Sequence, residues 1–144
     1  MRIRDRVRGP EESEGRGSIA FLVLVLIALG AVPVASTAWL ASLERAGYHV
    51  LEKNVRAGRE EIDLVVRRGD LVAFVEVKGR AARGRGHPLH AIGARKRAAI
   101  ARVARSWIAR HGHPGDVYRF DAVAVLPGGR GWLVEHVADA WRLG

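Results

Sequence analysis

The feature that most limits the possible folds is a pair of β-rich runs on either side of Gly69-Asp70. The runs cover 61–67 and 71–78, and most of their apolar positions hold valine, isoleucine, leucine or phenylalanine. Runs of this length joined by a Gly-Asp pair are typical of a hairpin with a two-residue turn. The sequence therefore predicts two adjacent antiparallel strands, with the residues next to the turn paired to each other.

The chain around this hairpin alternates helical and strand patterns. Apolar residues at three- and four-residue spacing predict one helix that ends before Gly47 and a second from Pro88 to Gly112. Further strands are predicted from short β-rich runs at 49–54, 119–126 and 132–137. The order of helix, three strands, helix and two strands indicates an α/β domain.

The first 35 residues differ in composition from the remainder. Residues 1–18 mix arginines with acids, glycines and a proline, which predicts a disordered tail. Residues 19–35 are uncharged and mostly aliphatic, and about 17 such residues are the minimum for a membrane span. Three interpretations of 19–35 stay open: a membrane anchor, a secretory signal cut near Ser36-Thr37-Ala38, and an extension translated from a misplaced start codon. A buried core helix is the remaining alternative.

Four charged side chains of the hairpin fall on one face if the strands pair as predicted. Strand alternation puts Glu61 and Asp63 on that face, together with Glu76 and Lys78 of the second strand. Asp63 then lies opposite Glu76, and two carboxylates so close repel each other unless a cation or a proton compensates. Mg²⁺ suits such a pair because it takes one or two carboxylates and keeps positions for water and phosphate. With the Lys78 ammonium nearby to neutralise a phosphate under attack, the pattern favours phosphodiester hydrolysis.

A simpler interpretation is that these charges line the solvated face of the hairpin. Glu61 and Lys78 would then form an ordinary cross-strand ion pair worth well under ~1 kcal/mol. The apolar neighbours of Asp63 and Glu76 argue against this, because such neighbours are typical of central strands. Central strands seldom carry acids on a face that a helix covers.

Two segments of the hairpin stand out together, Glu61-Ile62-Asp63-Leu64-Val65 and Phe74-Val75-Glu76-Val77-Lys78-Gly79-Arg80. Shorter motifs accompany them in order over about residues 35–141: Gly47-Tyr48, Asn54-Val55-Arg56, Gly86-His87-Pro88, Lys96, Arg119-Phe120-Asp121-Ala122-Val123 and Glu135-His136-Val137. This ordered set resembles the YraN-like family of small bacterial proteins. That family is assigned to the restriction-endonuclease-like, PD-(D/E)XK superfamily.

The resemblance implies a restriction-endonuclease-like fold over residues 36–144, with a four- or five-stranded mixed sheet flanked by helices. The apolar composition of 19–35 predicts an N-terminal hydrophobic helix before this fold. It implies that Asp63 and Glu76 bind the metal, Mg²⁺ or Mn²⁺, and that Lys78 is the catalytic lysine. The supporting residues would be Glu61, Arg80 and Lys96.

This chain departs from the family pattern at two places. The usual Gly-Glu at the start of the first helix falls on Ala35 and Ser36, which removes one acid that could act as an extra ligand. The usual glycine before Glu61 is Glu60. Elsewhere, Asp121 is interpreted either as a residue that supports the site or as a charge at a strand edge.

The positive charge of the chain has a definite location. The chain has 24 Lys and Arg against 15 Asp and Glu, a formal net charge of +9. The segment 79–110 holds nine of these basic residues and no acid. Such side chains contact phosphates, which gives affinity rather than sequence readout. We therefore expect a nucleic acid, DNA in particular, to be bound by Arg80, Arg83, Arg85, Arg95 and Lys96.

The sequence thus predicts a Mg²⁺-dependent phosphodiesterase, an endonuclease that acts on DNA. One alternative is a catalytically inactive nucleic-acid-binding module of the same fold, with or without a membrane tether. Another is a membrane-anchored assembly protein whose basic face meets anionic lipid. We expect the domain to be cytoplasmic, with attachment to the inner membrane through 19–35 as an open alternative. The absence of cysteine excludes disulfides and thiol nucleophiles.

Overall fold

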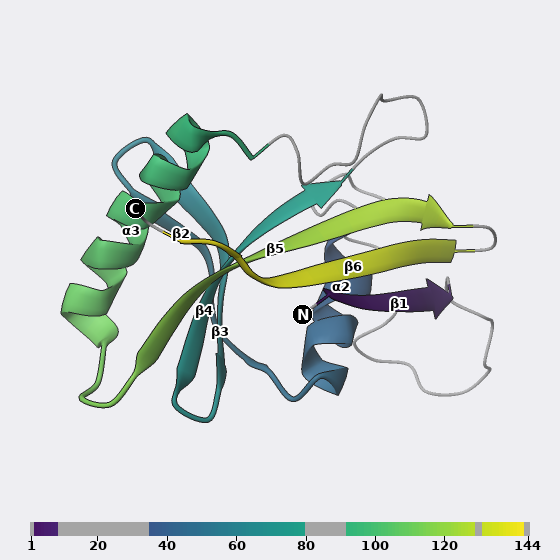
Figure 1. The fold of residues 1–144 in the computed structure, drawn as a ribbon, viewed down its shortest axis with the longest axis horizontal. Coiled ribbons are helices and arrows are strands. Elements are labelled where there is room, and N and C mark those ends of the chain that lie inside the picture. The colour runs from purple at the N-terminus through teal and green to yellow at the C-terminus, as the bar shows by residue number, and fades with distance from the viewer. Residues whose placement is uncertain (1, 9–34, 80–91, 129–130, 143–144) are drawn as a thin grey trace, which may run out of the picture.

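The computed structural model describes residues 2–8, 35–79, 92–128 and 131–142. Its elements in chain order are β1 (Arg2–Arg8), α2 (Ala35–Arg45), β2 (His49–Ala57), β3 (Glu60–Arg68), β4 (Leu71–Gly79), α3 (Ala94–His111), β5 (Val117–Gly128) and β6 (Gly131–Trp141). The strands form one mixed six-stranded sheet in the order β1-β6-β5-β4-β3-β2 (Figure 1). The α/β class and the mixed sheet flanked by helices are confirmed, but the sheet has six strands rather than four or five because β1 pairs with β6 and adds an edge strand.

The sheet is mixed because β4 and β5 run parallel, whereas the other neighbouring strands are antiparallel. A parallel pair needs a crossover connection, and α3 lies within the segment that joins β4 to β5 (Figure 1). The end of β4 is therefore the point at which the chain leaves the sheet and returns as a helix.

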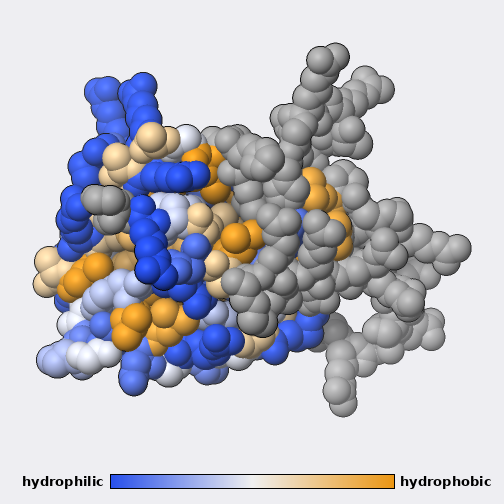
Figure 2. Space-filling view, viewed as in Figure 1, coloured by the Kyte–Doolittle hydropathy of each residue, from blue (hydrophilic) through white to orange (hydrophobic). Residues whose placement is uncertain are grey.

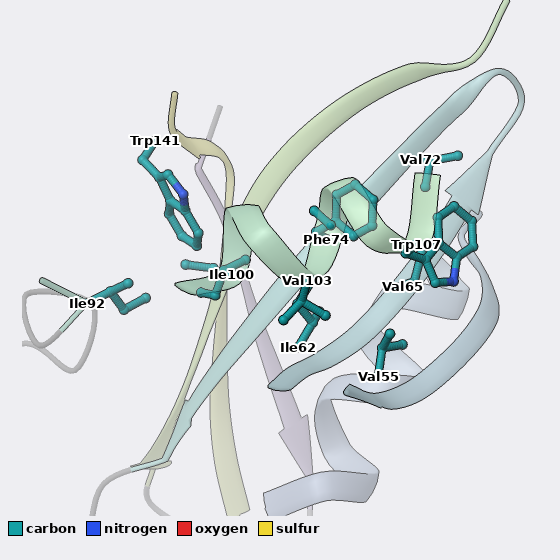
Figure 3. Close-up of a cluster of buried hydrophobic side chains, with 12 residues drawn as sticks. Val55, Ile62, Val65, Val72, Phe74, Ile92, Ile100, Val103, Trp107 and Trp141 are labelled. Carbon is teal, nitrogen blue, oxygen red and sulfur yellow. The ribbon is translucent and has the colours of Figure 1, made fainter. Parts of the chain in front are cut away.

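The helix α3 packs on one face of the sheet and forms the α3 core with it. Phe74 lies at the centre of this core and meets the Trp107 ring edge-on at 5.7 Å (Figure 3). Ile100 and Val103, one helical turn apart, complete the apolar stripe of α3 against the strands. Trp141, at the end of β6, closes the same core by stacking on Phe120.

The helix α2 packs on the opposite face and forms the α2 core. Trp39 and Leu43 supply its buried side chains, and they pack with Leu64, Val75 and other residues of the central strands. Because side chains alternate along a strand, β4 gives Phe74 to the α3 core and Val75 to the α2 core. Both faces of the central strands are thus covered, as their near-continuous apolar sequence indicates.

The hairpin of β3 and β4 has the turn that the sequence predicts. Arg68 pairs with Leu71, so that Gly69 and Asp70 form the two-residue connection. Gly69 has a φ of +61°, a conformation in which glycine carries no steric cost. The regular pairing continues as far as Leu64 and Val75.

Two boundaries differ from the sequence prediction. The disordered tail predicted for 1–18 contains β1, whose arginines at every second position have the period of a strand. The second helix begins at Ala94 rather than at Pro88, because Gly93 has an extended backbone (φ −74°, ψ 171°). Pro88 itself lies outside the described residues.

The hydrophobic segment predicted to be a helix, 19–34 in particular, also lies outside the described residues, as do Arg80, Arg83 and Arg85. Within the part of the chain that is described, no helix has the length and apolar character needed to cross a membrane.

Candidate functional site

The site forms where β3 and β4 diverge. The last regular pair joins Leu64 to Val75, one step before Asp63 would pair with Glu76. At this step the Asp63 side chain replaces the strand partner: its Oδ2 accepts a hydrogen bond from the Val77 backbone N–H at 2.7 Å. The carboxylate of Asp63 therefore has a fixed orientation and lies beside the next acid along β4.

Glu76 is the buried acid of the site, with only 2% of its surface exposed. Its position in β4 puts it on the α3 side of the sheet, two residues after Phe74. Oε1 forms an ion pair with the Lys78 ammonium at 2.6 Å. Oε2 is buried and has no hydrogen-bond partner among the described residues. A buried carboxylate oxygen without a partner is costly, which makes this atom a candidate ligand for a cation.

A second ammonium reaches the same acid from α3. Lys96 lies in the first turn of the helix, and its Nζ is 3.4 Å from Glu76 Oε1. The same Nζ donates to the backbone carbonyl of Glu61 at 3.3 Å. Lys96 thus joins α3 to both strands of the hairpin at the place where the acids meet.

The electrostatic state of the site depends on the proximity of its two acids. Burial and the neighbouring Glu76 carboxylate together raise the pKa of Asp63 to about 6, in spite of the Val77 hydrogen bond and the two lysines, which act in the opposite direction. Asp63 is therefore ionised at neutral pH, but its pKa lies closer to 7 than that of an ordinary aspartate.

The donor set fits a hard divalent cation. Asp63 and Glu76 each keep one carboxylate oxygen beyond the contacts described above. Oxygen ligands of this kind suit Mg²⁺ or Mn²⁺, which complete their coordination with water and substrate phosphate. No group of three or more His, Asp or Glu side chains suited to a metal occurs among the residues whose placement is described. Among these residues, the candidate metal site consists of the Asp63 and Glu76 carboxylates.

The structure brings together four of the residues singled out from the sequence: Asp63, Glu76, Lys78 and Lys96. The Glu61 side chain is not among them, because its Oε2 accepts a hydrogen bond from Arg56 Nε at 2.6 Å. The cross-strand pair of Glu61 and Lys78, expected for a purely solvated hairpin face, is therefore not formed. The strands have already separated at that step, and each residue takes a nearer partner.

A basic surface adjoins the site. Arg95, next to Lys96 in the first turn of α3, is exposed and lines a shallow hollow of about 380 Å³ together with Glu60 and Ala99. The space-filling view shows hydrophilic residues gathered over the region of α3 (Figure 2). Glu60, the residue that departs from the family pattern, is held at this hollow by an ion pair with Arg102.

Sequence reasoning did not foresee a second polar cluster, which we call the buried polar network: Tyr48, Arg119, Asp121 and His136. Asp121 is fully buried and accepts hydrogen bonds from Arg119 Nε at 2.7 Å and from the Asp139 backbone N–H at 3.0 Å. His136 Nε2 lies 2.8 Å from its other oxygen, and Arg119 also donates to the Tyr48 hydroxyl at 2.7 Å.

The buried polar network lies on the opposite face of the sheet from Glu76. Asp121 pairs with Val75 across the parallel strands, and Val75 belongs to the α2 core. Asp121 is therefore neither a support of the carboxylate site nor a charge at a strand edge. The available signal was its alternation with Phe120, which places the two residues on different faces.

These observations define a class of protein: a basic α/β domain in which a half-buried aspartate, a buried glutamate and two lysines meet at the end of a central hairpin. Residues 37–125 match the family model described as "Uncharacterised protein family UPF0102". The chain belongs to this family, which is the YraN family indicated by its motifs.

Several relatives show the same relationship along most of their length. The UPF0102 protein of Nitratidesulfovibrio vulgaris (strain DP4) is 39% identical over 103 residues, which are 72% of this chain and 77% of that protein. The UPF0102 protein of Methylorubrum populi is 45% identical over 105 residues, or 72% of this chain and 80% of that protein. The UPF0102 protein Mmc1_3298 of Magnetococcus marinus is 37% identical over 103 residues, which are 71% of this chain and 83% of that protein.

Proposed function

We propose that this protein is a metal-dependent phosphodiesterase that acts on nucleic acid, with DNA as the expected substrate. The observation that carries the proposal is the buried Glu76 carboxylate, whose Oε1 is neutralised by Lys78 while Oε2 has no partner among the described residues. A purely structural ion pair would not require a second carboxylate, that of Asp63, on the same side of the hairpin.

The fold supports the same proposal. A hairpin with Asp on one strand and Glu-x-Lys on the next, followed by a helix and a parallel strand, agrees with the restriction-endonuclease-like fold implied by the family resemblance. Fold analogy by itself does not define an activity, so the proposal depends on the site.

Asp63 and Glu76 would hold Mg²⁺ or Mn²⁺, and the bound ion would act as a Lewis acid toward a phosphoryl oxygen. The Val77 amide orients Asp63 for this task. Lys78 is one-third exposed and held at Glu76, so its ammonium lies where a phosphate could reach it. There it would stabilise the negative charge that develops on the phosphate during attack. Arg95 and Lys96, at the adjacent hollow, would contact the sugar–phosphate backbone.

Cleavage assays with linear, flapped and four-way DNA in Mg²⁺ or Mn²⁺ test the proposal, with single-stranded RNA as a comparison. We expect Glu76→Gln and Lys78→Ala to lower turnover by roughly 100-fold or more, because the first removes a charged ligand of the metal and the second removes the positive charge at the reacting phosphate. Glu61→Gln is the matched control, since that carboxylate is paired to Arg56 outside the site. Turnover that is the same in Glu76→Gln, Lys78→Ala and the wild type would show that the activity does not belong to this site.

One observation favours a second candidate, a nucleic-acid-binding module without catalysis. The first turn of α2 carries no acidic residue, at the place where the family has Gly-Glu. Salt-dependent DNA binding measured by fluorescence anisotropy, with no Glu76-dependent turnover in either metal, would favour this module.

A further inference from the structure

Lys96 is the one side chain of α3 that reaches the carboxylate pair in the described structure. Its Nζ is held from two sides, by Glu76 Oε1 at 3.4 Å and by the Glu61 carbonyl at 3.3 Å. These anchors lie on both strands of the hairpin, so the position of the ammonium is fixed even though 37% of the side chain is exposed. The positive charge of this fixed ammonium therefore influences the binding of any cation or phosphate at the two acids.

The charges of the site balance without any metal. Asp63 and Glu76 contribute two negative charges, and Lys78 and Lys96 contribute two positive ones. Both ammonium ions lie at one oxygen, Glu76 Oε1, and Asp63 Oδ2 is taken by the Val77 amide. What remains for ligands is one oxygen of each acid.

We propose that Lys96 takes the place of a second cation, so that the site binds a single divalent ion held by Asp63 and Glu76. One divalent ion brings the site to a net charge of +2, which a phosphate of the substrate partly offsets. A second divalent ion would have to bind next to two ammonium ions and the first metal, with no oxygen of Asp63 or Glu76 left for it, and Coulomb repulsion opposes this. This inference rests on the proposed function, because it assumes that the acids bind metal.

A merely structural Lys96, which only ties α3 to the hairpin, would behave differently from a cation substitute. Loss of a structural tie lowers stability and leaves the affinity for metal unchanged. Loss of a competing positive charge makes metal binding tighter, because the acids keep their charge and lose one counterion. The sign of the change in metal affinity therefore separates the two roles.

The experiment is calorimetric titration of the full chain with Mn²⁺ at pH 7.5, in the wild type and three variants. We expect one Mn²⁺ per wild-type chain. Lys96→Gln should bind Mn²⁺ more tightly by on the order of tenfold, because the variant loses a unit positive charge that would repel the bound ion. Lys96→Arg, which keeps the charge, should stay within about twofold of the wild type. Arg105→Gln removes the same charge from an exposed position further along α3, where salt screens it, and should also stay within about twofold.

The outcomes distinguish this inference from the proposed function. Two Mn²⁺ ions per wild-type chain, or an unchanged or weaker affinity in Lys96→Gln, would overturn the role of Lys96 and leave the metal site standing. A wild-type chain that binds no Mn²⁺ would overturn both. Urea unfolding of each variant in EDTA, which reports any loss of the structural tie separately, completes the comparison.

Discussion

Replacement of Asp63 by asparagine should make the metal-free protein more stable at alkaline pH. Burial and the Glu76 carboxylate raise the pKa of Asp63 from its ordinary value of 3.8 to about 6. The folded protein therefore binds this proton more tightly than the unfolded chain does. The resulting stability is fully present below about pH 4 and is lost as the pH rises through about 6.

The size of the effect follows from the same pKa. Each tenfold change in proton affinity corresponds to about 1.4 kcal/mol, so the ionised Asp63 costs the folded state up to about 3 kcal/mol at pH 8. The asparagine side chain of the variant has no proton to lose, and its amide oxygen can still accept the hydrogen bond from Val77. We expect Asp63→Asn to be more stable than the wild type by roughly 1–3 kcal/mol at pH 8, and to show little difference at pH 4.

Equilibrium urea unfolding in EDTA, at pH 4, 6 and 8, measures this difference. In thermal unfolding it corresponds to a rise of roughly 2–4 °C per kcal/mol for a chain of this size. Glu61→Gln serves as the matched control, because its exposed pair with Arg56 is worth at most about 1 kcal/mol and should show no comparable gain. If Asp63→Asn were less stable at pH 8, or gained equally at pH 4 and pH 8, the repulsion between the two carboxylates would be refuted. The stabilised variant should also lose Mn²⁺ binding, as expected when a destabilising group is kept for function.

Three further predictions concern the metal site, the buried polar network and the end of α3. The Mn²⁺ affinity of the wild type, measured by calorimetry, should increase as the pH rises through about 6, because Asp63 must lose its proton to bind the metal. If the affinity did not change between pH 5 and pH 8, this prediction would be contradicted. Asp121→Ala should lower the free energy of unfolding by about 3 kcal/mol at pH 7, because it leaves the guanidinium of Arg119 without its buried partner. Burial is opposed by hydrogen bonds that together hold the pKa of Asp121 below its ordinary value of 3.8, so the cost should begin to shrink as the pH falls below about 4, and a cost that stays constant down to the acid unfolding of the protein would count against this reasoning. Gly112→Ala should cost roughly 1–3 kcal/mol, since a Cβ there would lie 2.7 Å from the backbone oxygen of Ile108 and would also collide with the Tyr118 hydroxyl, and an unchanged urea midpoint would show that the end of α3 adjusts freely.

The central hairpin could be predicted from the sequence because its signals are local. The two-residue turn at Gly69 fixes the register, and the register together with strand alternation places Asp63 beside Glu76. The separation of β3 from β4 at Asp63, beyond the Leu64–Val75 pair, could not be predicted in this way. It depends on a side chain, that of Asp63, replacing a strand partner, and this exchange leaves no pattern in the sequence.

Contacts between distant parts of the chain were less accessible to prediction. The contact of Lys96 with Glu76 depends on where α3 begins, and Gly93 sets that point by its extended backbone rather than by a helix-capping side chain. The buried polar network joins residues of β5 and β6 to Tyr48, which lies between α2 and β2, and its charges satisfy one another out of water. Single-sequence patterns record which face a residue occupies, but not which charge it meets across the sheet.

The strand β2, at one edge of the sheet, has a consequence for how the protein behaves at high concentration. Its pairing with β3 shifts between Val50 and Glu52, and Asn54 has a φ of +52°, so the outer edge is bent rather than flat. An edge interrupted in this way is a poor template for a strand of another molecule. Leu51 is 43% exposed on this strand, and on a straight edge it would promote the stacking of copies into larger aggregates. We therefore expect the β2 edge to resist the addition of a strand from another molecule, and straightening of β2 to remove that protection.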